Sequence, residues 1–180
     1  IFNYDENHSL SPNGAGWREE DNPNFFGSAY SVVKGYTDEL MYLFNSSVLN
    51  LRIRMPIVSQ DTPRNFISKI IRYEKICSIP NSMTVLDELL PIALDMSLKE
   101  ITGTIHLVNP GVISHNEILQ MYKDNGHPFF KWENFTLEEQ SNVLDSGRSN
   151  NRLDTSRLEK MYPNVNNIQD AVLKCLRNWN

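Results

Sequence analysis

The chain has 180 residues, 40% of them hydrophobic, which is enough for one domain with a sizeable core. Its formal net charge of -5 argues against a nucleic-acid partner, and the absence of a long apolar run argues against a membrane partner. The two cysteines, Cys77 and Cys175, fit no metal-ligand or disulfide spacing, so we expect no metal site and a reduced, cytoplasmic protein.

Residues 9–23 are rich in Gly, Asn, Pro and acidic residues and are expected to form a surface loop. Beyond this loop, helical and strand-like patterns alternate along the chain. Helices are predicted over residues 24–44, 65–72 and 87–98, and further helices are predicted to begin near Ser114, Thr136, Thr155 and Ile168. Strands are predicted over residues 48–54, 76–79 and 104–108. This alternation indicates an α/β unit with mainly parallel strand pairing.

Local signals support several of these helix starts. Ser114 and Thr136 each begin an S/T-x-x-E capping box, in which two side chains satisfy free backbone N–H groups. Asp87 is expected to cap the helix that runs to Leu98, with Pro91 in or near its first turn.

Tyr30 and Lys34 carry the main chemical signal. Residues four apart lie on one face of a helix, so the Lys34 ammonium can favour the Tyr30 phenolate and lower the pKa of that phenol from about 10. Such a phenol can stabilise and then protonate the oxygen of a ketone during hydride transfer. A surface lysine beside a half-buried tyrosine would have the same spacing, so the pair alone does not establish a catalytic role.

A glycine-rich turn for a dinucleotide is not found in the chain. Gly14-Ala15-Gly16 has no third glycine and no preceding strand, so it is not the turn that cradles a pyrophosphate. The chain also opens at Ile1 without an initiator Met. We therefore expect a fragment whose cofactor cradle lies upstream, and an isolated chain that is inactive.

Six ordered segments resemble one family, the epimerase-reductases of nucleotide-rhamnose synthesis, which are extended short-chain dehydrogenases related to dTDP-4-dehydrorhamnose reductase. The segments are EDNPNFFGS (20–28), LRIRMPI (51–57), PRNFISK (63–69), IPNSMT (79–84), NPG (109–111) and RSNN (148–151). They cover nearly the whole chain in order. This is far more specific than the Tyr30–Lys34 spacing, and it favours a functional role for that pair.

The resemblance implies a fold and a domain arrangement. The fold is the C-terminal part of a Rossmann-like parallel sheet with flanking helices and a small substrate-binding subdomain. Residues 1–60 would complete the NADP-binding domain, and residues 61–180 would form mainly the substrate subdomain. Residues 84–108 would return to the Rossmann sheet.

The resemblance also implies an activity: 3,5-epimerisation and NADPH-dependent 4-keto reduction of a nucleoside-diphosphate 4-keto-6-deoxyglucose, giving an L-rhamnose nucleotide such as UDP-L-rhamnose. NADH is an alternative hydride donor, and a homodimer is left open. Two other readings remain: a 4-keto reductase without epimerase activity, and a non-catalytic regulatory subunit with a reductase-like fold.

Roles for single residues follow from the same resemblance. Tyr30 would donate the proton to O4, Lys34 would hold the nicotinamide ribose, and Lys69 would serve the epimerisation. The Thr and Cys that complete the family's catalytic set would precede Ile1, and neither Cys77 nor Cys175 replaces that Cys.

Further positions are expected to bind ligands. The strand-end residues expected to line the nicotinamide side are Met55, Pro56 and Ile57, although a plain turn would explain them equally well. The residues expected to contact the sugar nucleotide are Arg64, Asn65, Arg148, Asn150 and Asn151, although a polar turn would also explain the last three. The histidines show no paired spacing and are read as structural or surface residues: His8, His106, His115 and His127.

Overall fold

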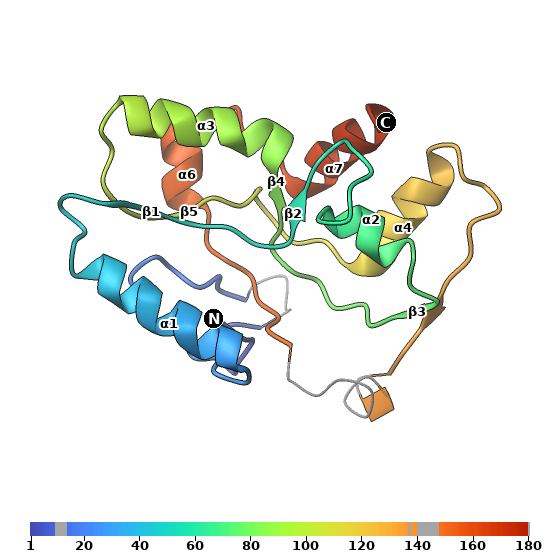
Figure 1. Cartoon of the computed structure of the whole chain (residues 1–180), viewed down its shortest axis with the longest axis horizontal. Coiled ribbons are helices and arrows are strands. Elements are labelled where there is room, and N and C mark those ends of the chain that lie inside the picture. Colours follow the sequence, from blue (N-terminus) through green and yellow to red (C-terminus); the bar gives the residue numbers. More distant parts are fainter. Residues whose placement is uncertain (10–13, 137, 140–147, 180) are drawn as a thin grey trace.

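The computed structural model describes residues 1–9, 14–136, 138–139 and 148–179, and within these ranges its strands form parallel pairs (Figure 1). The longest pair joins β1 (Leu49–Arg52) to β5 (Gly103–His106), with Leu49 opposite Gly103. The two shorter pairs join β2 (Pro56–Ile57) to β4 (Thr84–Val85) and β3 (Lys75–Ile76) to β6 (Glu133–Asn134). The predicted parallel pairing is confirmed.

Helices cover both faces of the β1–β5 pair. The helices of the described ranges are α1 (Ala29–Tyr42), α2 (Phe66–Ile70), α3 (Leu86–Leu98), α4 (His115–Asp124), α6 (Ser156–Met161) and α7 (Ile168–Arg177), and only some of them cover that pair. Helix α1 lies on one side of the pair, and α3 and α6 lie on the other (Figure 1). Helices α2, α4 and α7 gather near β2 and β4. One end of the molecule is therefore built around the β1–β5 pair, and the other mainly from these three helices.

The buried apolar side chains form separate clusters. The largest lies among β2, α2, α4 and α7 and includes Ile57, Ile67, Ile118 and Val172. A second cluster lies between α3, α6 and the β1–β5 pair, and a third, around Phe2 and Trp17, fastens the N-terminal segment. The N-terminal segment is therefore part of the packed fold.

Several predicted boundaries require correction. Helix α1 begins at Ala29 and not near residue 24, because Ser28 and Ser31 form a capping box that fixes its start. Helix α3 begins one residue before Asp87, and the Asp87 carboxylate instead accepts a hydrogen bond from the Ser59 N–H at 2.7 Å. Pro91 lies inside α3, beyond its first turn.

The other helix starts follow the sequence closely. The capping box at Ser114 is formed and precedes α4, and α6 and α7 begin close to the predicted positions. Thr136 and Glu139 exchange the hydrogen bonds of a capping box, but the helix predicted to follow them lies mostly outside the described residues. The strand predicted over residues 76–79 is shorter, since β3 ends at Ile76.

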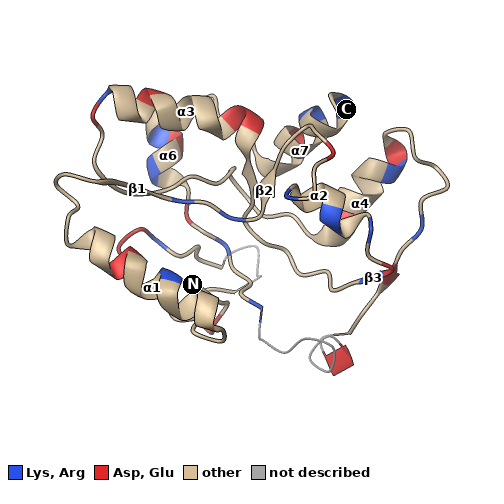
Figure 2. Ribbon diagram, in the orientation of Figure 1, with Lys and Arg blue, Asp and Glu red and all other residues tan. Residues whose placement is uncertain are grey.

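Basic and acidic residues are interspersed over the helices and loops (Figure 2). Among the helices that the structure describes, none combines the length and the apolar character needed to cross a bilayer.

Candidate active site

Helix α1 presents Tyr30 and Lys34 on one face. The Lys34 Nζ atom lies 5.8 Å from the centroid of the Tyr30 ring, which is within range of a cation–π contact. Tyr30 is 72% exposed and Lys34 is also exposed, so the phenol is open to a ligand approaching the outer side of α1. This geometry fits a phenol that acts on a bound carbonyl, with the ammonium beside it.

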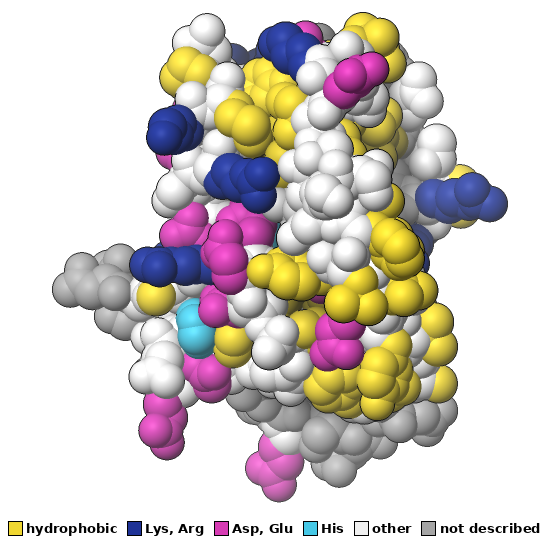
Figure 3. All heavy atoms as spheres, turned by 90° about the vertical axis from the view of Figure 1, so that its left-hand side faces the viewer, with side chains coloured by type: hydrophobic (Ala, Val, Ile, Leu, Met, Phe, Trp, Pro, Cys, Tyr) yellow, Lys and Arg dark blue, Asp and Glu magenta, His cyan; other side chains and the backbone are white. Residues whose placement is uncertain are grey.

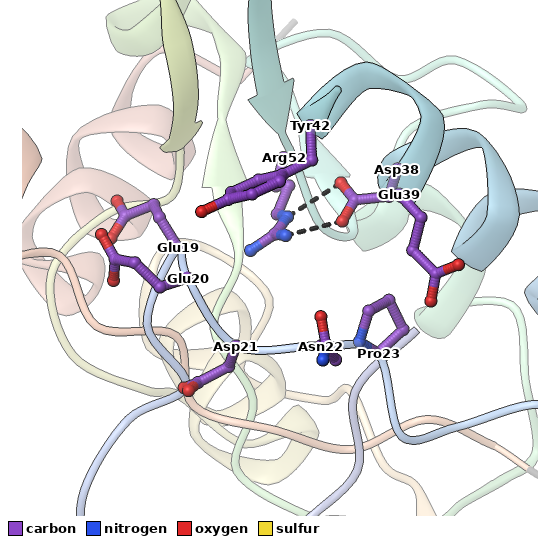
Figure 4. A pocket seen from close by; sticks show the side chains of 9 residues that line it. All are labelled: Glu19, Glu20, Asp21, Asn22, Pro23, Asp38, Glu39, Tyr42 and Arg52. Atoms are coloured by element: carbon purple, nitrogen blue, oxygen red, sulfur yellow. Dashed lines mark hydrogen bonds and ion pairs between the residues drawn. The ribbon is translucent and has the colours of Figure 1, made fainter. Parts of the chain in front are cut away.

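The buried side of α1 is fastened to the sheet by an ion pair (Figure 4). Arg52 on β1 donates from Nη2 to Asp38 Oδ2 at 2.6 Å and from Nε to Asp38 Oδ1 at 2.9 Å. Both side chains are only 8% exposed, and a two-point contact of this kind fixes their orientation. The pair therefore sets the position of α1, and with it the position of Tyr30.

His106 on β5 continues this buried network. Its Nε2 lies 2.9 Å from Arg52 Nη1, and its Nδ1 lies 2.9 Å from the Asp154 carbonyl oxygen. Since an arginine only donates, we assign Nε2 as the acceptor and Nδ1 as the protonated nitrogen of a neutral ring. Burial, assisted by the Arg52 charge, lowers the pKa of His106 to about 4.

Beside this network lies a small cavity of about 180 Å³ with an acidic wall. Figure 4 shows carboxylates from the 19–21 segment and from α1 around it. Glu19 accepts a hydrogen bond from the His106 backbone N–H at 3.2 Å, and burial raises the pKa of its carboxyl group. The acidic wall does not suit a phosphate or a pyrophosphate.

A larger cavity, of about 570 Å³, lies at the other end of the molecule. Its lining residues are Met55, Phe66, Lys69, Ile70, Tyr73, Lys75, Ile76, Cys77, Ile79, His115, Phe135, Arg148, Ser149 and Asn150. They come from α2, β3, the start of α4, the 148–150 segment and the connections that carry Met55, Tyr73, Cys77, Ile79 and Phe135. We call this space the Lys69 cavity. Its volume and its mixture of aromatic, cationic and amide groups are typical of a small-molecule site.

Met55 lines the Lys69 cavity with a strained backbone. Its φ of 41° lies in the left-handed region that non-glycine residues rarely adopt. The neighbouring Arg54 fixes this conformation, because its backbone N–H donates to Thr84 Oγ1 at 3.0 Å and its carbonyl accepts from the Thr84 N–H at 2.8 Å. Strain held in this way often occurs beside ligand sites.

The polar 148–150 segment is held in place by the buried Arg54 guanidinium. Arg54 donates to Ser149 Oγ at 3.0 Å, to the Ser149 carbonyl at 2.9 Å and to Asn81 Oδ1 at 2.9 Å. Asn81 Nδ2 in turn donates to Asn150 Oδ1 at 2.8 Å. Burial lowers the pKa of Arg54 to about 10, so the side chain stays charged at neutral pH. Arg148 is exposed at the cavity wall.

Thus the structure gathers Met55, Lys69, Arg148 and Asn150 around one cavity, while Tyr30 and Lys34 stay outside its lining.

The other predicted ligand-binding residues have different surroundings. Asn65 caps α2, and its amide donates to the Val58 and Gln60 carbonyls, both at 2.8 Å. The Asn151 amide donates to the Phe2 carbonyl at 2.8 Å, and the Ile57 side chain is fully buried in the largest core cluster. Arg64 is exposed and Pro56 is half-buried, and neither lines the Lys69 cavity.

Some lining residues were not singled out as site residues from the sequence. Ser149 lies within the RSNN segment but has no predicted role, and the sequence predicts that Cys77 and His115 lie outside the site. Burial raises the pKa of the Cys77 thiol, which disfavours the reactive thiolate. For His115, the only sequence signal is its place directly after the Ser114 cap.

Comparisons with known proteins place this geometry in context. The chain is 52% identical over 175 residues to the bifunctional dTDP-4-dehydrorhamnose 3,5-epimerase/dTDP-4-dehydrorhamnose reductase of Arabidopsis thaliana, covering 97% of this chain and 58% of that protein. It superposes on the UDP-rhamnose synthase of Acanthamoeba polyphaga mimivirus with a TM-score of 0.94 at 48% identity, covering 99% of this chain and 61% of that one. A search of family models gave no match.

A more distant neighbour shares the fold. The dTDP-4-dehydrorhamnose reductase of Bacillus anthracis, solved in complex with NADP, superposes with a TM-score of 0.66 at 16% identity, covering 88% of this chain and 58% of that one. The expected α/β, Rossmann-like reductase fold is therefore confirmed. The chain is homologous to nucleotide-rhamnose epimerase/reductases over nearly its whole length, and it spans about three fifths of the length of these relatives.

Proposed function

We propose that the protein carrying this chain, as a homologue of those enzymes, converts a nucleoside-diphosphate 4-keto-6-deoxyglucose to an L-rhamnose nucleotide. It epimerises C3 and C5 of the sugar and then reduces the C4 ketone with NADPH, and the product is UDP-L-rhamnose. The observation that carries this proposal is the close similarity, in sequence and in fold, to a UDP-rhamnose synthase over 99% of the chain. Tyr30, Lys34 and Lys69 supply chemistry that agrees with it.

In the reduction step, NADPH supplies the hydride to C4. As the C4–H bond forms, the electron pair of the carbonyl π bond moves onto O4, and the Tyr30 hydroxyl protonates that oxygen. The Lys34 ammonium, which lies over the Tyr30 ring, stabilises the phenolate left behind and holds the nicotinamide ribose.

In the epimerisation steps, the C4 ketone acidifies the protons on C3 and C5. A base removes such a proton, the electron pair moves into an enolate, and an acid returns a proton to the opposite face of the carbon. Lys69 serves as one member of this acid/base pair, since its amine lines the cavity. The enolate oxygen is at C4, so epimerisation must precede reduction.

Ligand placement is part of the same proposal. Arg148, as a guanidinium at the cavity wall, suits the pyrophosphate, and Asn150 suits a ring hydroxyl. Arg64 contributes from the exposed surface near α2, while Asn65 and Asn151 act by holding the loops around the cavity.

For the cofactor, we assign the strand-end segment 55–57 to the nicotinamide side of the site. Met55 lines the Lys69 cavity, and Pro56 and Ile57 fix the backbone behind it. Residues 1–60 and 84–108 belong to the cofactor part of the fold, which the β1–β5 pairing supports, and the rest forms mainly the substrate part.

The reduction is tested in the full-length protein by Tyr30→Phe, with NADPH oxidation as the measurement. We expect the rate of reduction of the pre-epimerised 4-keto sugar to fall about 10²- to 10⁴-fold, because the proton donor to O4 is lost. Tyr36→Phe is the matched control, since Tyr36 is an exposed tyrosine of the same helix. Full activity of Tyr30→Phe would refute the assignment of Tyr30 as the proton donor.

The epimerisation is tested by Lys69→Ala, with deuterium exchange from solvent into C3 and C5 as the measurement. Exchange should be lost while reduction of the pre-epimerised sugar survives, and Lys99→Ala, on the surface at the end of α3, is the control. Unaltered exchange would refute the role of Lys69, whereas a wild-type protein that reduces the pre-epimerised sugar without any exchange would be a 4-keto reductase without epimerase activity. A wild-type protein that binds the sugar nucleotide but never oxidises NADPH would instead be a binding subunit.

A further inference from the structure

The Lys69 cavity contains an imidazole that the proposed function does not use. His115, the first residue of α4, lines the cavity, and its ring meets the edge of Phe66 with 5.2 Å between the ring centroids. Its Nδ1 atom is buried and has no hydrogen-bond partner among the described residues. Among the described residues the Nε2 atom of His115 has no hydrogen-bond partner either. Unlike Nδ1, however, Nε2 is not fully buried. Nε2 is therefore the ring nitrogen that a ligand can reach.

The surroundings of His115 keep its ring neutral. Burial lowers the pKa of this imidazole to about 4, and the positive end of the α4 dipole also disfavours an imidazolium at the first helical position. A buried N–H without an acceptor is costly, so we assign the proton to Nε2 and leave Nδ1 as the bare nitrogen. His115 then offers a single neutral N–H donor at the cavity wall.

We propose that His115 is a substrate-binding residue, whose Nε2–H donates a hydrogen bond to an oxygen of the hexose that occupies the Lys69 cavity. This inference rests on the proposed function, because it takes the ligand to be a sugar nucleotide. It assigns His115 to the hexose and not to the nucleoside diphosphate.

The chemistry of the wall favours the hexose. A neutral donor matches a hydroxyl or carbonyl oxygen, whereas the phosphates are better served by the cationic groups of the same cavity, Lys75 and Arg148. Phe66, whose ring contacts His115, and Tyr73, which lines the same cavity, offer apolar surface to the C–H groups of a sugar ring. The cavity therefore offers charged groups to the phosphates and neutral groups to the sugar ring.

The test compares two variants of His115 in the full-length protein. His115→Phe keeps an aromatic ring against Phe66 and removes both ring nitrogens. His115→Gln places an amide N–H close to the position of Nε2 and so retains the donor. Calorimetry measures the affinity of each variant for two probes, UDP-4-keto-6-deoxyglucose and UDP alone, in the presence of NADP⁺.

We expect His115→Phe to weaken binding of the sugar nucleotide by about tenfold while leaving the affinity for UDP unchanged, since one hydrogen bond to the hexose is lost. His115→Gln should recover most of that loss. A merely structural role would instead weaken both probes together, and the amide would not rescue it.

The outcomes separate the two proposals. If the wild-type protein does not bind the sugar nucleotide more tightly than UDP, the proposed function itself fails. If the wild-type protein shows that preference and His115→Phe shows it equally, only the role of His115 is refuted. Weakened binding of both probes by His115→Phe, without rescue by His115→Gln, also overturns it.

Discussion

Helices α1 and α7 use their faces in opposite ways. The buried side of α7 is almost entirely apolar: Ile168, Ala171, Val172, Cys175 and Leu176. The buried side of α1 consists of Ser31, Gly35 and Asp38, and its large apolar side chains face outward: Tyr30, Val33, Tyr36 and Leu40. Figure 3 shows hydrophobic side chains gathered on the side of the molecule where α1 lies.

The difference shows how each helix is held. Helix α7 is held by burial of apolar surface in the largest core cluster. Helix α1 is held by its Ser28 capping box, by a close approach at Gly35 and by the Asp38–Arg52 pair. At Gly35 a Cβ atom would lie 2.8 Å from the Phe26 ring, so any other residue would require that ring to move. Polar anchoring of α1 leaves its outer face, with Tyr30, free for chemistry.

The largest effect on this comparison is expected from Asp38→Ala. Removing the carboxylate leaves the Arg52 guanidinium buried without its partner, which should lower the free energy of unfolding by about 3–5 kcal/mol. Urea denaturation of the full-length protein gives this value, and Glu39→Ala, at the adjacent exposed position, is the control. A loss below about 1 kcal/mol would show that other contacts anchor α1.

A pair of leucine truncations tests the apolar side of the comparison. Leu176→Ala should destabilise the protein by about 3 kcal/mol, because Leu176 is 1% exposed and its removal leaves a cavity in the core. Leu40→Ala, at a position that is 50% exposed, should cost less than about 0.5 kcal/mol. Equal losses in urea denaturation would mean that the outer face of α1 is covered in the full-length protein.

Acid should lower the stability of the protein through His106, which belongs to the buried network behind α1. The folded state holds this ring neutral with a pKa of about 4, whereas the unfolded chain takes up a proton near pH 6.5. Between these values the unfolded state binds more protons, so stability falls as the pH falls. From pH 7 to pH 5 we expect a loss of about 2 kcal/mol from this one group.

The measurement is the free energy of unfolding as a function of pH for the wild type and for His106→Asn, in which that part of the slope should disappear. His127→Gln, which changes an exposed ring stacked on Tyr122, is the control. An unchanged slope in His106→Asn would assign the acid sensitivity to other groups.

Local patterns predicted the elements better than the cavity. The Ser114 capping box and the strand near residues 48–54 depend on neighbouring residues, and both are found in the structure. The start of α1 was predicted too early, because Ser28 ends the extended segment before it. The sequence predicts a structural or surface role for His115, because nothing in its sequence neighbourhood indicates that its ring lines the same cavity as Lys69.

The alternation of helices and strands, the one-turn spacing of Tyr30 and Lys34, and the ordered segments shared with the rhamnose enzymes can all be found in the amino-acid order alone. These features depend on residues that are close in the chain. The folded structure was needed to show that Asp38 and Arg52 anchor α1, and that Lys69, His115 and Arg148 line one cavity. Those contacts join segments that are distant in the chain and depend on how the elements pack. A local sequence pattern therefore does not reveal them.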